Sequence, residues 1–279
     1  MRVAAVQLNS RNDKELNLKT AVDRVAEAAE GGARFVLLPE YVDYLGPDDG
    51  ARQAAETEDG PAHTAFAEAA RTNGIWLHCG SIRVAAPDGR AFNTSVVFRP
   101  DGSVAARYQK IHLFDVDIPD GTAHRESDTV APGEELVTCD VDDWRVGLST
   151  CYDLRFPELY RGLILAGADL LVVPAAFTFY TGRDHWEVLL RARAIESQSY
   201  VLAAGQVGTH VADGGVVART NGRSMLVDPW GTVVACAADT PDIVFGELDR
   251  SRHDTVRTEV PSLTNRRPEV YAGHPLAGV

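Results

Sequence analysis

The sequence has no long hydrophobic run, and this absence argues against one class of protein. A membrane-spanning helix needs about 20 consecutive apolar residues, and no run of 18 occurs among the 279 residues. The chain also begins at Met1 without the charged start, apolar core and cleavage site of a secretory signal. We therefore expect a cytoplasmic protein that has no membrane partner.

Positive charge is also scarce. Lys and Arg number 27 against 40 for Asp and Glu, which gives a formal net charge of −13. A protein of this charge repels polyanions and is kept apart from its own copies by self-repulsion. The composition argues against nucleic acid as a partner.

Cysteines are few, and they do not form a pattern. The chain has four, with no CxxC pair and no spacing typical of metal ligands. Disulfide frameworks and zinc sites come with such patterns, so we expect reduced thiols and no metal. Three of the cysteines lie in apolar runs, as packing thiols do: Cys79, Cys139 and Cys236.

What the sequence does contain is an alternation of strand-like and helix-like segments. The apolar residues follow first the spacing of a buried strand and then that of a helix. The expected elements of the first half are a strand over 2–8, a helix ending at Gly31, a strand over 34–40, a helix over 61–73, a strand over 75–82 and a hairpin turning at 100–102. A long loop is expected from there to about Glu135.

The second half of the chain repeats this plan. Three segments have echoes in the same order: RVAAVQL in RVGLSTC, GARFVLLPE in GADLLVVPA, and VFRPDGSVAA in LVDPWGTVVA. Two copies of one α/β unit leave such a pattern. Because one copy alone does not cover both faces of its sheet, we expect two sheets packed face to face with helices outside.

The chain is expected to form a single domain over residues 1–248. The remainder, 249–279, shows little periodicity and is interpreted as an arm at a dimer interface. The helices expected within 158–167 and 185–197 are assigned to the same interface, because they carry more apolar residues than one core-facing stripe requires. These residues are Leu159, Leu163, Leu189 and Leu190.

The two copies differ where chemistry could take place. The first ends its second strand with Pro39-Glu40, where the second has Pro174-Ala175. The second ends its first strand at Cys151, where the first has Leu8. Ligands of open α/β sheets bind outside the carboxyl ends of the strands, so both reactive residues are placed at a site-bearing edge. Lys110, at the end of the hairpin, is a third candidate.

These three residue types together indicate acyl transfer without a histidine. A helix expected to start near Pro157 predicts a lowered pKa for the Cys151 thiol, which would favour the nucleophilic thiolate. Glu40 can relay the proton, and Lys110 can hold a developing oxyanion beside a backbone N–H. Taken singly, each residue also fits a structural role as a buried thiol, a helix cap or a solvated charge.

Three motifs carry a resemblance to a known family. FVLLPEY, YQKIHLFD and STCYDLRFPELY resemble the glutamate, lysine and cysteine motifs of the nitrilase superfamily of carbon–nitrogen hydrolases, in that chain order. The resemblance runs from Met1 to about Tyr271. It implies an α/β fold, a four-layer α-β-β-α sandwich with an internal pseudo-two-fold repeat. It also implies homodimers, with further assembly left open, and no cofactor or metal.

The resemblance also implies a role for each motif residue. Glu40 would be the general base, Lys110 the oxyanion holder and Cys151 the nucleophile, while Tyr152 would lend its backbone N–H. The family carries a second glutamate seven residues before a Pro-Gly glycine. That glutamate falls on Glu126, which would orient the lysine and the substrate.

Within the superfamily, HWEVLLRARAIESQSYV, MLVDPWGTVVA and RRPEVY are most similar to the branch of deaminated-glutathione amidase and omega-amidase. The implied activity is hydrolysis of a small linear carboxamide to carboxylate and ammonia through a cysteine thioester. The implied substrate is a deaminated-glutathione-like compound or a dicarboxylate monoamide. The alternatives are an aliphatic amidase, nitrilase or N-carbamoyl hydrolase of uncharged compounds, a thiol redox sensor, and a silent scaffold.

Substrate contacts are expected from seven further residues: Tyr44, His112, Phe114, Arg155, Phe177, Thr181 and Arg183. The two arginines are the candidates for binding a substrate carboxylate, because Lys110 is committed to the oxyanion. Arg155 lies one turn from Glu158, so pairing between these two is the alternative.

Overall fold

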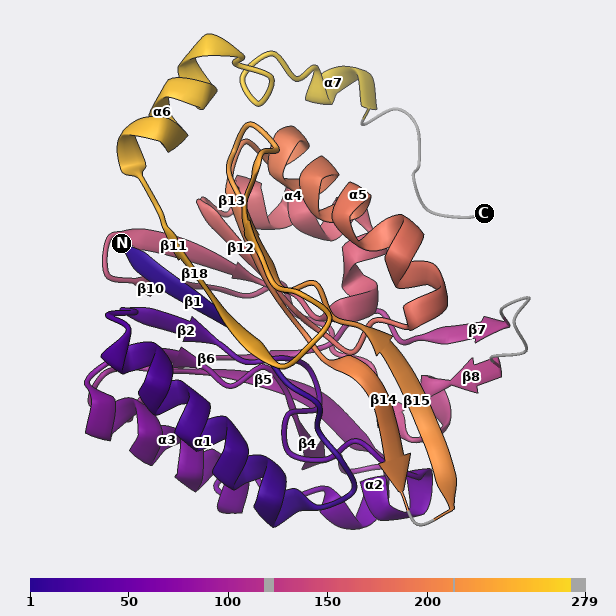
Figure 1. The fold of residues 1–279 in the computed structure, drawn as a ribbon. Helices are drawn as coiled ribbons and strands as arrows, with labels where there is room; N and C mark the ends of the chain where they lie inside the picture. Colours follow the sequence, from indigo (N-terminus) through magenta and orange to yellow (C-terminus); the bar gives the residue numbers. More distant parts are fainter. Residues whose placement is uncertain (118–122, 213, 272–279) are drawn as a thin grey trace.

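The computed structural model describes residues 1–117, 123–212 and 214–271. Two large β-sheets lie face to face, with helices on their outer sides (Figure 1). The strands of the first sheet are β1 (Arg2–Gln7), β2 (Phe35–Leu37), β3 (Trp76–His78), β4 (Ile82–Ala85), β5 (Ala91–Phe98), β6 (Val104–Gln109), β9 (Val130–Ala131) and β18 (Asp242–Glu247). Those of the second are β10 (Thr138–Val141), β11 (Trp144–Leu148), β12 (Leu170–Ala175), β13 (Tyr200–Gly205), β16 (Met225–Val227) and β17 (Val233–Cys236).

Helices and two separate hairpins complete the described part of the chain. The helices are α1 (Lys14–Glu30), α2 (Asp48–Ala54), α3 (Pro61–Asn73), η1 (Glu126–Asp128), η2 (Cys151–Arg155), α4 (Pro157–Leu165), α5 (Phe179–Ser197), α6 (Arg250–Glu259) and α7 (Pro268–Tyr271). The hairpins are β7 (Asp115–Asp117) with β8 (Ala123–Arg125), and β14 (Val207–Ala212) with β15 (Gly215–Asn221).

The two sheets share one topology, which confirms the predicted internal repeat. Each has three consecutive parallel strands, β1-β2-β3 in the first and β11-β12-β13 in the second. Each trio has an antiparallel neighbour on both sides, β18 and β5 in the first sheet and β10 and β16 in the second. The three sequence echoes therefore fall on corresponding strands of the two sheets.

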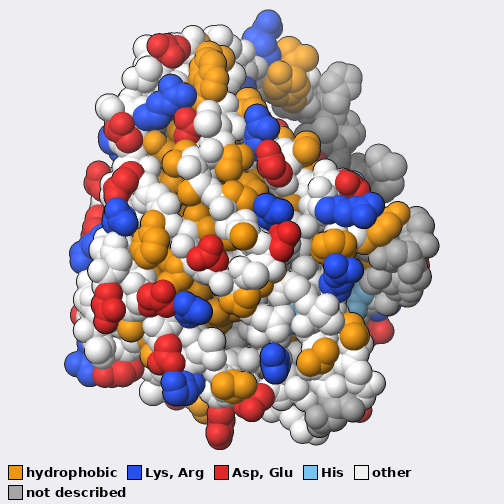
Figure 2. All heavy atoms as spheres, in the orientation of Figure 1, with side chains coloured by type: hydrophobic (Ala, Val, Ile, Leu, Met, Phe, Trp, Pro, Cys, Tyr) orange, Lys and Arg blue, Asp and Glu red, His pale blue; other side chains and the backbone are white. Residues whose placement is uncertain are grey.

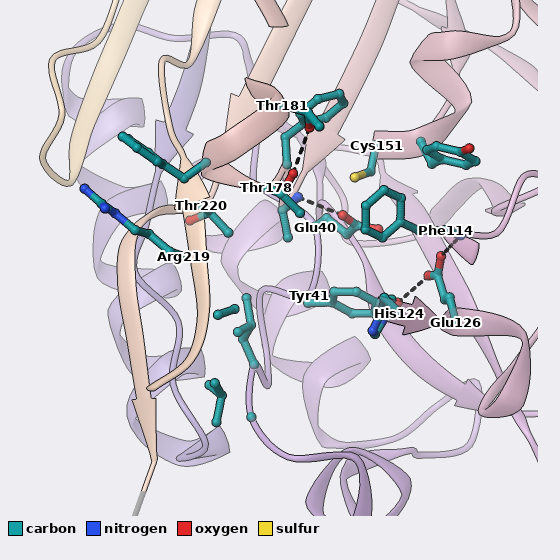
Figure 3. Close-up of a pocket in the computed structure, with 18 of the residues that line it drawn as sticks. Glu40, Tyr41, Phe114, His124, Glu126, Cys151, Thr178, Thr181, Arg219 and Thr220 are labelled. Atoms are coloured by element: carbon teal, nitrogen blue, oxygen red, sulfur yellow. Dashed lines mark hydrogen bonds between the residues drawn. The ribbon is translucent and has the colours of Figure 1, made fainter. Parts of the chain in front are cut away.

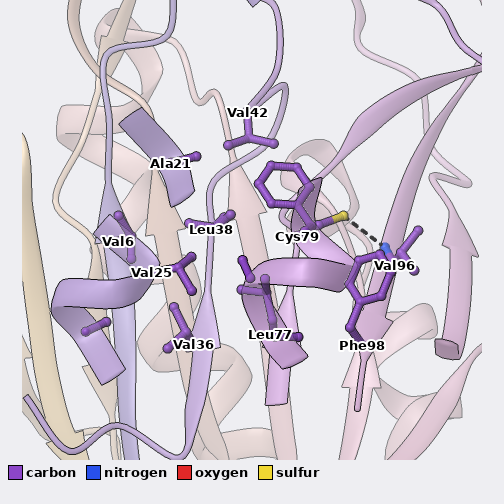
Figure 4. Close-up of a cluster of buried hydrophobic side chains, with 14 of the residues drawn as sticks. Val6, Ala21, Val25, Val36, Leu38, Val42, Leu77, Cys79, Val96 and Phe98 are labelled. Atoms are coloured by element: carbon purple, nitrogen blue, oxygen red, sulfur yellow. Dashed lines mark hydrogen bonds between the residues drawn. The ribbon is translucent and has the colours of Figure 1, made fainter. Parts of the chain in front are cut away.

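Apolar side chains fill the space between the layers. β1 contributes Val3 and Ala5 to the cluster between the two sheets, and Ala4 and Val6 to the cluster beneath α1 and α3 (Figure 4). Successive side chains of a strand point to opposite faces, so one buried strand serves two layers. A third cluster lies between the second sheet and helices α4 and α5. The four-layer α-β-β-α sandwich is thus confirmed.

The prediction of one long loop up to about Glu135 is wrong in part. Its residues form the β7–β8 hairpin, the short helix η1 and strand β9, which pairs with β5. These elements are short, and β7 carries two exposed aspartates. Such a segment has no apolar run and no periodicity from which strands could have been predicted.

The predicted arm also contains more regular structure than its sequence suggested. Helix α6 begins after Asp249, whose side chain accepts the backbone N–H of Ser251, and it buries His253 near Asp169 of the same chain. The boundary at residue 248 and the place of the arm at a dimer interface stay predictions. Residues 272–279 of the arm lie outside the described residues.

The four leucines expected at the dimer interface pack against the core of their own chain. Leu159, Leu163 and Leu190 are buried, and Leu189 packs against the same cluster, because α4 and α5 pack onto the second sheet and onto each other. Exposed apolar side chains on these two helices lie at other positions, namely Leu165, Val188 and Ile195. A homodimer stays a prediction, now with these residues as its candidates.

Charged side chains of both signs are spread over the face shown in Figure 2, and hydrophobic side chains gather across its middle, over the strands at the centre of Figure 1. Within the part of the chain that the structure describes, no helix is both long and apolar enough to cross a membrane.

Candidate active site

Cys151 lies in a tight turn at the carboxyl end of β11. Its φ angle is +51°, in the left-handed region that residues other than glycine seldom adopt. The short helix η2 starts at this residue. Such strained positions persist where the surrounding structure holds them, and they cluster at active sites.

Asp153 holds this turn against the segment that follows β6. It is fully buried, and one carboxylate oxygen accepts the backbone N–H of Thr150 at 2.8 Å and the Tyr108 hydroxyl at 2.6 Å. The other accepts the backbone N–H of His112 at 3.0 Å and lies 2.7 Å from its Nδ1. One carboxylate thus fixes the position of the cysteine turn relative to the end of the lysine strand.

Replacing Asp153 by asparagine should lower the free energy of unfolding by about 2–4 kcal/mol. Asparagine keeps one acceptor oxygen, so at least one buried donor loses its partner, at about 1–3 kcal/mol each and more where the acceptor was charged. Urea unfolding of the wild type and the variant measures the difference. Asp140→Asn, at an exposed aspartate that pairs with Arg145, is the matched control. Equal stability of Asp153→Asn and the wild type would contradict this role.

Lys110 lies buried between two carboxylates. Its Nζ is 3.0 Å from Oε1 of Glu40 and 3.0 and 2.8 Å from the two oxygens of Glu126. Burial opposes the charge of the ammonium group, but the two carboxylates outweigh burial and raise the pKa of Lys110 well above its ordinary value. Lys110 therefore stays charged at neutral pH.

Glu40 joins the two halves of the fold. It follows β2, and its Oε2 accepts the backbone N–H of Ala176, which follows β12, at 2.7 Å. Its Oε1 accepts from the side chain of Asn93 on β5 at 2.8 Å, in addition to Lys110. The carboxylate of the first copy thus contacts the backbone directly after Ala175, the residue that takes its place in the second copy.

Glu126 is held as a permanently ionised group. Burial disfavours its charge, but Lys110, the Tyr41 hydroxyl at 2.6 Å and the backbone N–H of Phe114 at 2.6 Å all stabilise it. Together these groups lower the pKa of Glu126 to about 2. It is therefore suited to holding Lys110 in place and unsuited to carrying protons at neutral pH.

The lowered thiol pKa predicted for Cys151 is wrong. Burial raises the pKa of Cys151 well above its ordinary value, and the negative charge of Glu40 adds to this effect, while Lys110 opposes it only in part. The helix at Cys151 is a single short turn, and two carboxylates surround one ammonium group. The resting thiol therefore keeps its proton and needs a base to become a nucleophile.

These groups lie at one end of a cavity of about 680 Å³ (Figure 3). The cavity is lined by Glu40, Lys110, Glu126 and Cys151, and by Tyr152, which directly follows Cys151. Its remaining walls come from the loop before α2, from the start of α5 and from β15. The volume lies within the range of about 300–1,000 Å³ that is usual for small-molecule sites.

The structure brings four of the seven expected substrate contacts to the cavity wall: Phe114, Phe177, Thr181 and Arg183. It places the other three elsewhere. Tyr44 is buried against the loop at Gly46 and Gly50, and His112 stacks on Phe156 at 3.7 Å. Arg155 does not pair with Glu158 among the described contacts, but lies 3.2 Å from Nδ1 of His185 and above the Phe177 ring.

Sequence reasoning missed several residues of the site. Tyr41 directly follows Glu40, and Asn93 is a polar residue inside a buried strand, which is a signal that could have been used. Arg83 and Arg219 also line the cavity, from β4 and β15. They carry no local signal, because only the fold brings their strands to the cavity.

The described residues contain no group of three or more His, Cys, Asp or Glu side chains placed to hold a metal ion. The cluster of Glu40, Lys110 and Glu126 is complete in itself, since the ammonium group occupies the centre at which two carboxylates could otherwise bind a cation.

Known proteins are similar to this chain over nearly its whole length. The carbon-nitrogen hydrolase family model matches residues 2–258. The deaminated glutathione amidase of Bos taurus is 40% identical over 283 residues, which cover 99% of this chain and 85% of that protein. The structure of Saccharomyces cerevisiae Nit3, a member of branch 10 of the nitrilase superfamily, is 31% identical with a TM-score of 0.85 and covers 96% of both chains.

A third relative is an amidase from Nesterenkonia sp. AN1. It is 26% identical with a TM-score of 0.81, over 98% of this chain and 99% of that one, and its mutant structure shows Michael addition of acrylamide at the active site cysteine. The matched family model, the identity and the shared fold agree with the buried cysteine, lysine and glutamates described above. The chain therefore belongs to the carbon–nitrogen hydrolase family, and it is a hydrolase that acts on amides.

Proposed function

We propose that this hydrolase cleaves a linear amide with a carboxylate at its far end, through a thioester on Cys151. The observation that carries the proposal is the buried cluster of Glu40, Lys110 and Glu126, which lines one cavity together with the Cys151 thiol. It combines a nucleophile, a base and a cation in a site shielded from water. Electrostatic stabilisation is strongest in such a site.

In the first stage the thiol becomes a thioester. Because its pKa is raised, Cys151 needs a base, and the carboxylate of Glu40 takes the thiol proton as sulfur attacks the amide carbon. The negative charge that develops on the carbonyl oxygen is held by Lys110 and the backbone N–H of Tyr152. In the resting site the three N–H donors of the ammonium group face three carboxylate oxygens, two of which belong to Glu126, so Lys110 exchanges one of its two contacts with Glu126 for the oxyanion.

The first stage ends when the C–N bond breaks: Glu40 returns the proton to the departing amine, which leaves as ammonia when the amide is unsubstituted, and the thioester remains. In the second stage the thioester is hydrolysed. A water molecule then attacks the thioester carbon and gives its proton to Glu40. The carboxylate product forms, and the proton returns to the sulfur of Cys151, which restores the resting thiol.

The role assigned to Glu126 is to position the lysine. Its pKa of about 2 keeps it ionised throughout the cycle, and its two hydrogen bonds hold the ammonium group of Lys110. Its oxygens also accept hydrogen bonds from the Tyr41 hydroxyl and from the backbone N–H of Phe114. The lysine is thereby held in place before the substrate arrives, as preorganised oxyanion stabilisation requires.

Two observations favour an anionic substrate. The Bos taurus relative, at 40% identity, is a deaminated glutathione amidase, and deaminated glutathione carries carboxylates. Three arginines line the cavity: Arg183 on α5, Arg219 on β15, and Arg83, which stacks on the Tyr41 ring beside Glu126. A thiol redox sensor is disfavoured, because an oxidisable thiol needs thiolate character and burial of Cys151 opposes it.

The wild-type enzyme should have a higher kcat/KM for 2-oxoglutaramate and succinamate than for butyramide. An amide of this length fills only part of the cavity, so the contact is expected from Arg83, which stacks on Tyr41 beside Glu126. A charge-assisted contact between arginine and carboxylate contributes about 1.5–3 kcal/mol, or roughly 10- to 150-fold in kcat/KM. Ammonia release measured over a range of substrate concentrations gives the three values. If butyramide is the best of the three, the enzyme acts on uncharged amides and the anionic substrate is wrong.

A further inference from the structure

The wall of the cavity opposite Cys151 carries an exposed arginine that stacks on an aromatic ring. Arg219 lies on β15, and its guanidinium carbon is 3.8 Å from the centre of the Phe179 ring at the start of α5. Figure 3 shows Arg219 and Cys151 on opposite sides of the cavity, with Thr178 and Glu40 between them. An arginine stacked on an aromatic ring keeps its hydrogen-bonding edge free.

The β14–β15 hairpin is anchored to the site from both sides. The backbone N–H of Asn221 donates to the carbonyl of Phe177 at 2.9 Å, and Thr220 forms an isolated antiparallel β-bridge with Thr178. On the other side the buried His210 lies 2.8 Å from the hydroxyl of Thr220 and 2.7 Å from the carbonyl of Ser10. The backbone at Arg219 is therefore fixed relative to the catalytic cluster.

The charge of Arg219 has no carboxylate partner within the described ranges. The other cations of the cavity do have partners. Lys110 lies between Glu40 and Glu126, and Arg183 is 3.6 Å from Asp184. Arg83 donates to the carbonyl of Tyr44 at 2.9 Å and has an acidic neighbour in the buried Asp43. Arg219 is the cation of this wall that is left for an anionic ligand.

The size of the cavity indicates how far such a ligand extends. At roughly 30 Å³ for each water-sized group, 680 Å³ holds about twenty groups. Deaminated glutathione has about that number of non-hydrogen atoms, which is about twice the number in 2-oxoglutaramate. A short monoamide bound at Cys151 therefore fills about half of the cavity, whereas a tripeptide-length amide fills all of it, including the part beside Arg219.

We infer that Arg219 binds the terminal carboxylate of an elongated amide substrate and so sets the preference of the enzyme for long over short amides. The inference rests on the proposed function, because it needs the amide to be cleaved at Cys151. The contact is a charge-assisted hydrogen bond that can be bidentate. The contact lies away from the reacting atoms. It favours long substrates because only they bind at Cys151 and at Arg219 at the same time.

Three substrates and one variant test this contact. The substrates are deaminated glutathione, the same compound with its terminal carboxylate converted to a methylamide, and 2-oxoglutaramate, each followed by chromatography of the remaining substrate. In Arg219→Gln the ratio of kcat/KM for deaminated glutathione to that for 2-oxoglutaramate should fall about 10- to 150-fold. For the wild type, kcat/KM for the methylamide should be lower than that for deaminated glutathione by the same factor.

The losses in kcat/KM caused by Arg219→Gln and by the methylamide should not add. Once Arg219 is replaced, conversion to the methylamide should cost nothing further, because the same contact is already missing. Arg223→Gln is the matched control: this arginine follows the hairpin, pairs with Asp239 and does not line the cavity. It should keep the wild-type ratio.

The outcomes separate the two proposals. If the wild type cleaves none of the three amides, the proposed function is wrong. If it cleaves them but Arg219→Gln keeps the wild-type ratio, or if the methylamide is as good a substrate as the acid, the amidase assignment stands and the carboxylate site at Arg219 is wrong.

Discussion

Replacing Cys151 by alanine should abolish amide hydrolysis and leave the protein folded. The thiol is the nucleophile in the proposed reaction, and no other cysteine lines the cavity within the described residues. Without it the thioester does not form, so turnover should fall by at least about 10⁴-fold. The side chain is small and lies at the cavity wall, so its truncation removes little packing. Ammonia release and circular dichroism measure the two effects.

Cys236→Ala is the matched control for this loss. Contrary to the prediction that it is a packing thiol, Cys236 on β17 is exposed. It does not line the cavity, and its replacement should leave turnover unchanged. Substantial ammonia release by Cys151→Ala would require another nucleophile and would contradict the mechanism. Loss of activity in Cys236→Ala would show that the assay responds to thiols in general.

Replacing Glu40 by glutamine is expected to reduce kcat by at least about 10²- to 10⁴-fold, the usual contribution of general acid–base catalysis. Glutamine has the same shape and can still accept a hydrogen bond from Ala176, but it takes no proton from a thiol whose pKa is raised by burial. The same variant should also react more slowly with iodoacetamide at Cys151. Peptide mass spectrometry of the alkylated protein measures this rate.

The control for the charge change is Glu158→Gln, at an exposed glutamate near the start of α4. Its kcat and its rate of alkylation should equal those of the wild type. A Glu40→Gln variant that keeps wild-type turnover would show that another group accepts the thiol proton.

Much of the architecture was predictable, because it depends on patterns that repeat along the chain. The echo of GARFVLLPE in GADLLVVPA placed two parallel strands at corresponding positions of two sheets, as the structure confirms. The motifs around Glu40, Lys110 and Cys151 also pointed to one cavity, and the structure brings these residues together. Local spacing was sufficient because each residue ends a strand of an α/β sheet.

The electrostatics of the site could not be predicted in the same way. The pKa of Cys151 depends on burial and on Glu40 and Lys110, which come from elements far away in the sequence. A helix start in the sequence suggested a thiolate, but the enclosed site with its two carboxylates reverses the direction of the shift. The predicted contacts Tyr44, His112 and Arg155 differ for a related reason. Packing turns these side chains toward the loop at 46–50, toward Phe156 and onto the Phe177 ring.

The sequence motifs did not predict the wall of the cavity that lies opposite Cys151. Arg219 lies in a hairpin whose register and anchoring to Phe177 and Thr178 are properties of the folded chain. No spacing in the sequence relates it to Cys151. Substrate size is therefore a property that only the assembled cavity indicates.

The mass of the Cys151 peptide during turnover tests the central claim most directly. Wild-type enzyme is mixed with 2-oxoglutaramate, quenched with acid at successive times and digested with a protease at low pH. The proposed thioester predicts that the peptide carrying Cys151 gains the mass of the 2-oxoglutaryl group while substrate remains, and loses it when substrate is exhausted. An acyl group on another peptide, or continued turnover with this peptide unmodified at every time, would contradict the mechanism.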